Sequence, residues 1–231
     1  MELEINSLRY SVVVLGAMNP AIHHPQWYEA VGMLSAAEAQ EAMRGGALAV
    51  APQLAQFQFA GFQIQCLPGR WQIEAAGSQQ RNRVIDLAAL TFQRLGETPI
   101  NAYGLNARFD VSTGAKNAFG GLTTQFTEEP LDLSFDGIPP DFESLEVSYT
   151  LPTIKLEGQP DVERRLKATI GRAPHRPDAV VVNFNAHHEI IMRTEFAHFD
   201  LDRLLRASAD VFETEDTLLK HIVSALIDLK R

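Results

Sequence analysis

The stretch from Gln56 to Val111 limits the fold more than any other part of the sequence. Apolar residues alternate with glutamines over Phe62–Cys66, which is the two-residue period of a strand with one buried face. Pro68-Gly69 then supplies a turn, because proline presets φ and glycine accepts a positive φ. The alternation resumes over Trp71–Ala75 and, after a helical segment, over Tyr103–Val111. This order of strand, turn, strand, helix and strand describes a folding unit and not a catalytic motif.

The helix within this stretch, Arg83–Leu95, is apolar on more sides than a sheet can cover. Its apolar residues form two neighbouring stripes: Val84, Leu87, Ala88, Thr91 and Leu95, and then Ile85, Ala89 and Phe92. A helix at the surface of a domain usually has one such stripe. We therefore expect a second cover, either the C-terminal helix Leu218–Ile227 or a second subunit. The alternation also predicts that Trp71 is buried between the hairpin and this helix.

The composition predicts a soluble, cytoplasmic protein with a core of its own. The chain has 231 residues, of which 45% are hydrophobic and 21% charged, enough for one large domain or two small ones. The only cysteine, Cys66, has no partner for an internal disulfide, so a reducing compartment is the simpler expectation. Met1–Tyr10 lacks the features of a signal peptide, and no apolar run is long enough to cross a bilayer.

The charge of the chain argues against nucleic acid and anionic lipid as partners. The formal net charge is -9, whereas nonspecific binding to polyanions needs a basic surface. The best short basic candidate is Glu163–Lys167. Its alternative interpretation is the outer face of a strand, which we prefer.

The remaining sequence predicts strands and helices in two groups. Strands are expected over Leu3–Ala17, Leu48–Ala51, Leu54–Leu67, Leu145–Leu156, Leu166–Ile170 and Ala179–Met192, and helices over Pro25–Met43, Leu201–Phe212 and from Thr214 onward. Pro152 indicates an edge strand or a bulge, and Asp200 can cap the helix that follows it. We expect an N-terminal α+β unit at 1–112, a connecting segment at 113–144 and a C-terminal α+β unit at 145–231, and the two units can share one sheet.

The densest group of metal-ligand residues is His187-His188-Glu189. In a strand, His187 and Glu189 point to one face and His188 to the other, so only two of them can converge on one ion. A metal site at His187 and Glu189 therefore needs a third ligand from elsewhere; Glu195 and His198 are near in sequence. The alternative is a solvated strand end.

Other polar groups have simpler interpretations. His23-His24 precedes a helix and is expected to be exposed to solvent. Glu128-Glu129 and Glu213–Asp216 are expected to be solvated charges of a loop or a helix start. Ser112–Lys116 lacks the spacing of a phosphate-binding loop, and no Gly-x-Ser-x-Gly motif is present.

Two segments, Phe62–Glu74 (FQIQCLPGRWQIE) and Pro99–Val111 (PINAYGLNARFDV), carry a family resemblance. They resemble segments of a sporadically distributed bacterial family of uncharacterised proteins of about this length. In that family a strand, a turn and a second strand lead to a helix, and a strand opening Gly-Leu follows, as at Gly104-Leu105 here. The C-terminal segment Asp200–Leu226 is also similar. The resemblance implies an α+β fold and transfers no catalytic residues.

We therefore expect an α+β protein with mostly antiparallel strands and with helices packed on one face. The expected function is a binding or protein-interaction module without catalytic activity or cofactor, with a second copy of the chain or another protein as partner. No nucleic acid or membrane is expected. The alternative is a metal-dependent hydrolase that uses His187 and Glu189.

Overall fold

The structure is a computed structural model that describes residues 4–112, 118–120, 144–191 and 199–228. Its strands form one nine-stranded sheet in the order β2-β3-β4-β5-β1-β6-β9-β8-β7, and every neighbouring pair is antiparallel. The strands are β1 Glu4–Gly16, β2 Ala49–Ala51, β3 Leu54–Phe59, β4 Phe62–Leu67, β5 Arg70–Ala76, β6 Ile100–Ser112, β7 Ser144–Ile154, β8 Asp161–Ala173 and β9 Arg176–Ile191.

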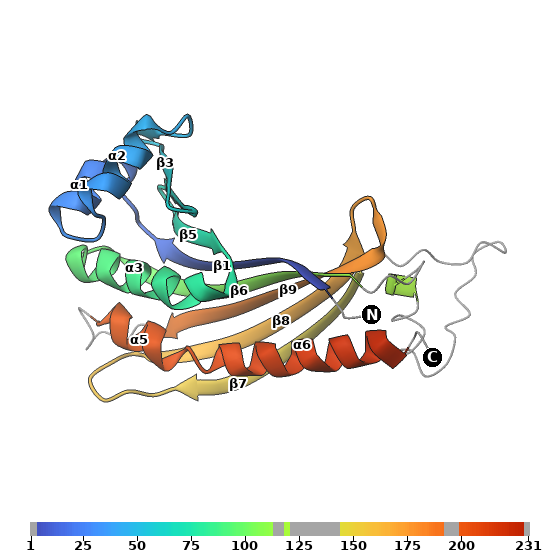
Figure 1. Ribbon diagram of the computed structural model, residues 1–231. Coiled ribbons are helices and arrows are strands. Elements are labelled where there is room, and N and C mark those ends of the chain that lie inside the picture. Colours follow the sequence, from blue (N-terminus) through green and yellow to red (C-terminus); the bar gives the residue numbers. More distant parts are fainter. Residues whose placement is uncertain (1–3, 113–117, 121–143, 192–198, 229–231) are drawn as a thin grey trace, which may run out of the picture.

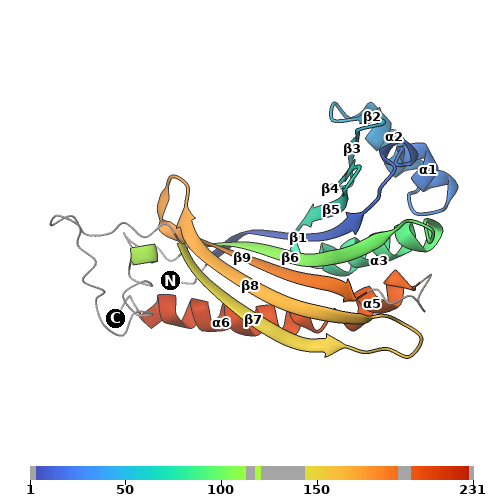
Figure 2. The same ribbon diagram turned by 180° about the vertical axis from the view of Figure 1, so that it is seen from behind.

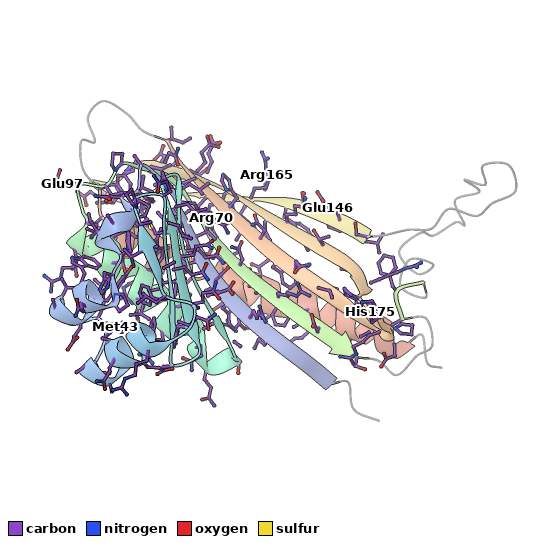
Figure 3. The ribbon with its side chains drawn as sticks, turned by 90° about the horizontal axis from the view of Figure 1, so that it is seen from above. Met43, Arg70, Glu97, Glu146, Arg165 and His175 are labelled. Carbon is purple, nitrogen blue, oxygen red and sulfur yellow. The ribbon has the colours of Figure 1, made fainter. Side chains whose placement is uncertain are left out.

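All labelled helices lie on the same face of this sheet (Figures 1 and 2). They are α1 Pro25–Ala30, α2 Ala36–Arg44, α3 Arg81–Arg94, α5 Leu201–Ala207 and α6 Val211–Asp228, with short 3-10 turns at Pro20–Ile22 and Ser78–Gln80. We call this side of the sheet the helix face and the opposite side the open face. In the described part of the chain, no helix covers the open face (Figure 3).

The alternation of apolar and polar residues separates the two faces. Val12 of β1 lies opposite Ile73 of β5 and Leu105 of β6, and all three are buried on the helix face. Their chain neighbours, such as Ser11 and Asn106, point to the open face and are only half-buried. A slip of one residue between two strands would exchange the faces, so burial of the apolar rows sets the register.

The sheet is bent. Figure 1 shows that the end formed by β2, β3 and β4 rises out of the plane of the other strands, on the side opposite α5 and α6. Helices α1 and α2 lie on the outer side of this raised end (Figure 1). The open face therefore lies on the inner side of the bend.

The structure confirms the α+β fold, the antiparallel strands and several local predictions. β1 lies in the middle of the sheet, and Pro68-Gly69 connects β4 to β5. β7 is an edge strand, and its pairing with β8 shifts register between Leu151 and Ile154, around Pro152. The side chain of Asp200 accepts a hydrogen bond from the Arg203 N–H and caps α5.

Four predicted elements are wrong in their bounds. The expected strand Leu54–Leu67 is the hairpin β3–β4, because Ala60 and Gly61 both have positive φ, 44° and 80°, and reverse the chain. The expected helix Pro25–Met43 is two helices. It breaks at Gly32, with φ 78°, and α2 begins at a capping box of Ser35 and Glu38. The expected helix Leu201–Phe212 ends at Ala207, and the last helix begins at Val211 and not at Thr214.

The second cover of α3 comes from within the chain. Ile85 is only 6% exposed, and α5 lies beside α3, where Arg206 pairs with Asp86 at 3.2 Å. Of the two expected kinds of cover, the structure shows one from within the chain, but the covering helix is α5 and not Leu218–Ile227. The start of α6 meets α3 through the ion pair of Arg81 with Asp216 at 3.4 Å.

Both predicted units contribute strands to the same sheet. β6 of the N-terminal unit pairs with β9 of the C-terminal unit over eleven residue pairs, from Ala102–Glu189 to Ser112–Ala179. Most of the predicted connecting segment, 113–144, lies outside the described residues. The division into two units stays a prediction.

Trp71 joins three elements. Its side chain is fully buried and meets Phe92 of α3 edge to face, with ring centroids 5.3 Å apart. Its indole Nε1–H donates a hydrogen bond of 3.1 Å to the hydroxyl of Tyr28 in α1. The predicted burial of Trp71 is confirmed, and the contact with α1 is an additional finding.

Replacing Trp71 by alanine is expected to lower the free energy of unfolding by about 3–5 kcal/mol, because it leaves a cavity where the hairpin, α1 and α3 meet. Denaturant unfolding followed by circular dichroism measures this loss. A matched change at Leu67, which is 36% exposed on the neighbouring strand, should cost well under half as much. A loss below about 1 kcal/mol for Trp71→Ala would contradict its place in the core.

Candidate functional site

The open face carries a polar row across its centre. Asn185 of β9, Asn106 of β6 and Ser11 of β1 occupy neighbouring register positions. The Asn185 amide donates to the Asn106 Oδ1 at 2.8 Å, and the Asn106 amide donates to the Ser11 Oγ at 3.2 Å. Asn185 itself is exposed. Amide groups both donate and accept hydrogen bonds, so this row can bind donor groups as well as acceptor groups of a partner.

A second set of amide side chains, four glutamines, lies on the raised end of the sheet. Gln58 donates to Gln63 at 3.0 Å, and Gln65 donates to Gln56 at 3.0 Å, each pair joining β3 to β4. These glutamines are the polar positions of the strand alternation. The open face is therefore rich in amides from β3 to β9.

A pocket of about 410 Å³ lies on the outer strands, where β7 separates from β8 at the register shift. His187 lies opposite Arg165, and Glu189 lies opposite Glu163, across β8 and β9. All four line the pocket and are exposed. Figure 3 looks down on this face and shows Arg165 there, with β7 and Glu146 farther out. The pocket thus brings together two cationic or basic groups and two carboxylates.

The structure places the predicted metal-site residues on one face, as expected. His187 and Glu189 are exposed on the open face, whereas His188 is fully buried on the helix face. Among the described residues, no group of three or more histidine, cysteine, aspartate or glutamate side chains is arranged to hold a metal ion. Glu195 and His198 lie outside the described residues. The metal site at His187 and Glu189 stays a prediction without an identified third ligand.

His188 belongs to a buried polar cluster on the helix face, opposite the pocket. Its ring stacks on Tyr103 with centroids 4.6 Å apart and planes 9° apart. Its Nδ1 lies 3.1 Å from the Ala186 carbonyl oxygen, an arrangement in which Nδ1 carries the proton and donates it. Burial, and then the positive charge of Arg164, lower the pKa of His188 to about 3. This histidine is therefore neutral at physiological pH and is shielded from any ligand on the open face.

Hydrogen bonds and an ion pair of the same cluster connect the junction between α5 and α6 to the sheet. Arg164 of β8, with its side chain 5% exposed, holds both carboxylate oxygens of Asp210 at 3.1 and 2.6 Å. The Tyr103 hydroxyl is 2.7 Å from Ser208 Oγ, and Ser208 Oγ donates to the Leu204 carbonyl at 2.8 Å. The predicted basic patch is therefore divided, because Arg164 points into the protein and Arg165 points to the open face. The preference for a strand face is confirmed for Arg165 and is wrong for Arg164.

The His23-His24 pair is not a solvent-exposed pair as expected. His23 is 1% exposed, and its Nδ1 lies 2.7 Å from the Tyr28 hydroxyl, which also accepts from Trp71. Burial lowers the pKa of His23 to about 4. His24 caps α1, since its Nδ1 accepts a hydrogen bond of 3.2 Å from the Gln26 N–H. Both histidines stabilise the start of α1, a role that the neighbouring Pro25 could have indicated.

Glu215 also differs from its prediction as a solvated charge. It is 1% exposed, because it lies on the stripe of α6 that faces the sheet. Burial raises the pKa of Glu215 to about 8, while Arg81 lowers it and Asp216 raises it further. The Arg81 guanidinium lies 5.0 Å from the centre of the Tyr10 ring and pairs with Asp216 at 3.4 Å. Glu215 is thus a buried, mostly protonated acid away from the open face.

Neither a family model nor a curated protein matches this chain. No helix in the described ranges is long and apolar enough to span a bilayer.

Replacing Glu215 by glutamine should change how stability depends on pH. The pKa of Glu215 rises from an ordinary 4.5 to about 8 on folding, so the folded state binds the proton more tightly. The wild-type protein therefore loses stability as pH rises from about 5 to 8, and Glu215→Gln removes that loss. The stability of the variant relative to the wild type should rise by about 1.4 kcal/mol per pH unit in this range.

Urea unfolding at several pH values measures this trend, and Glu213→Gln at an exposed site of the same helix is the control. The control should show no such trend. A difference between Glu215→Gln and wild type that stays constant from pH 5 to 8 would contradict the buried acid.

Proposed function

We propose that this chain is a non-catalytic protein-binding module whose partner docks on the open face of the sheet. One observation carries the proposal: the open face carries polar side chains on strands from β3 to β7, with a small buried apolar patch at Ala179 and Val181, and no described helix covers it on the inner side of the bent sheet. An antiparallel sheet commonly leaves one face to water, but this face also has a pocket and ordered amide rows.

The chemistry of the open face fits a folded protein partner. Carboxylates and basic groups alternate across it, as at Glu189, His187 and Arg165, so no single sign of charge dominates. Interfaces between proteins that also exist apart are about as polar as the rest of the surface and hold many hydrogen bonds. The amides of Asn106 and Asn185 can supply such bonds without a change of protonation.

The same face is poorly suited to nucleic acid. Single-stranded nucleic acid is held by aromatic side chains that stack on bases and by basic grooves. The open-face positions of the described strands are occupied by residues such as Gln65, Ser11, Asn106, Asn185 and Lys167, and none of these positions holds Phe, Tyr or Trp. The net charge of -9 supports the same conclusion.

The pocket at His187 and Glu189 keeps the metal-dependent hydrolase as a second candidate. Two residues that are typical metal ligands share its wall, and Glu163 lies opposite Glu189. Against it, Arg165 lies opposite His187, and a fixed positive charge on the neighbouring strand disfavours a bound cation. We therefore assign the pocket to the binding surface.

Asn185→Arg tests the proposal, because it places a long charged side chain at the exposed centre of the open face. Wild-type protein, immobilised and exposed to a lysate of its source cells, is expected to retain a partner that Asn185→Arg retains at least tenfold less. The matched control is Thr217→Arg, which makes a similar change at an exposed position of α6, on the other side of the sheet. This control should retain the partner as the wild type does.

Two results would count against the open face. If Thr217→Arg abolishes retention and Asn185→Arg does not, the partner docks on the helices. If protein purified without a histidine tag contains one transition metal per chain, and His187→Ala loses it, the hydrolase candidate replaces the binding module.

A further inference from the structure

The outer edge of β7 is a long strand edge that no described strand pairs. β7 has eleven residues, whereas β2 at the opposite edge has three. An edge strand presents a row of backbone N–H and C=O groups that can pair with another chain, and short edges limit this risk. The two edges of this sheet therefore differ, and only β7 is long enough for an extensive pairing.

β7 also exposes apolar side chains on the helix face. Val147 is 44% exposed and Tyr149 is 39% exposed. Their partners in β8, Ala168 and Leu166, are 5% and 0% exposed. β7 is the outermost strand on this side of the sheet, as Figure 3 shows from above. The apolar row thus continues past the edge of the helix layer.

β7 has few of the features that usually protect an edge strand. Edge strands are commonly blunted by lysine, proline or inward-pointing charge. From Ser144 to Leu151 the only charged residue is Glu146, and it is already paired with Lys167 at 2.5 Å. Pro152 blunts only the C-terminal end, after the residues that pair regularly with β8.

We infer that the outer edge of β7 pairs with β7 of a second copy of this chain, in an antiparallel arrangement centred on Ser148. Directly opposed residues in an antiparallel pair lie on the same face, so a two-fold axis perpendicular to the sheet keeps both helix faces on one side. The result is one continuous sheet across two copies.

The side chains of β7 complement themselves in this register. Val147 lies opposite Tyr149 of the second copy, and Leu145 lies opposite Leu151, so apolar residues meet on the helix face. On the open face, Ser148 meets Ser148 and Glu146 meets Thr150 of the second copy. No like charges face each other, and aromatic–β-branched pairs of this kind stabilise a sheet. This self-complementarity favours a second copy over an unrelated extended peptide.

This inference does not depend on the proposed function. Pairing uses the strand edge, with side-chain contacts between the two β7 strands on both faces, and it leaves the open face of the other strands exposed in both copies. Loss of the dimer and loss of the open-face partner are therefore separate results.

Val147→Lys tests the interface. The position is exposed within one copy, so the variant should fold, but it places a charge opposite Tyr149 of the second copy. Light scattering across a concentration series should give the wild type twice the 25.6 kDa mass of one chain and give Val147→Lys the mass of one chain, with unchanged circular dichroism. The control is Leu90→Lys on α3, an apolar residue that is 41% exposed, and it should remain a dimer.

Ser148→Cys tests the register. Two copies of this residue meet at the proposed two-fold axis, so mild oxidation should link the chains through a disulfide. Glu146→Cys is the matched control, because its partner would be Thr150, and it should not link efficiently. The native Cys66 is fully buried and should not react in either variant.

Three results would overturn the inference. They are a wild-type protein that stays at the mass of one chain at the highest concentration, a Val147→Lys variant that remains a dimer, and a disulfide that forms at residue 146 in preference to residue 148.

Discussion

The separation of the sheet into one apolar face and one polar face is the constraint on which the rest of the structure depends. Each strand alternates, and the register places the apolar rows of neighbouring strands side by side, as Ile73, Val12 and Leu105 show. The five labelled helices then lie on that face, because only there can they bury their apolar stripes. The same alternation leaves the opposite face to mostly polar side chains. It therefore explains both why helices cover one face of the sheet and why the other face is open.

This constraint also sorts the chemistry of the molecule. The histidines with strongly lowered pKa values, His23 and His188, lie on the helix face, where burial keeps them neutral and each contributes to packing. The buried acid Glu215 lies there as well. The polar residues within reach of a ligand, including His187 and Arg165, lie on the open face. Perturbed pKa values often indicate active sites, but here they indicate the layer between helices and sheet.

Local patterns in the sequence predicted most strands, and the reasons are physical. Alternation over Phe62–Cys66 and Trp71–Ala75 is a direct record of which side chains face the core. Pro152 predicted an edge strand because proline cannot donate to a ladder. The hairpin turn at Ala60-Gly61 was missed, since it lacks the asparagine or aspartate that usually precedes glycine in such turns. The capping box at Ser35 and Glu38 was a usable signal for the break between α1 and α2.

Contacts between distant segments could not be predicted in the same way. Nothing near Arg164 in the sequence indicates that its guanidinium forms an ion pair with the carboxylate of Asp210, 46 residues away. Nor does periodicity say that α5 and not α6 lies beside α3. For the candidate site, alternation correctly separated His187 and Glu189 from His188. The pocket that contains them depends on the pairing of β7, β8 and β9, which only the three-dimensional structure shows.

The proposed function requires that the open face be exposed to solvent and free to meet a partner. Thiol accessibility measures this directly, because the only native cysteine, Cys66, is buried on the opposite face. In an Asn185→Cys variant, a bulky maleimide reagent is expected to modify residue 185 as fast as it modifies an exposed thiol in a short peptide. Cys66 should react only after unfolding. Protection of residue 185 to the same degree as Cys66, in the folded variant, would contradict the account and show that the open face is covered.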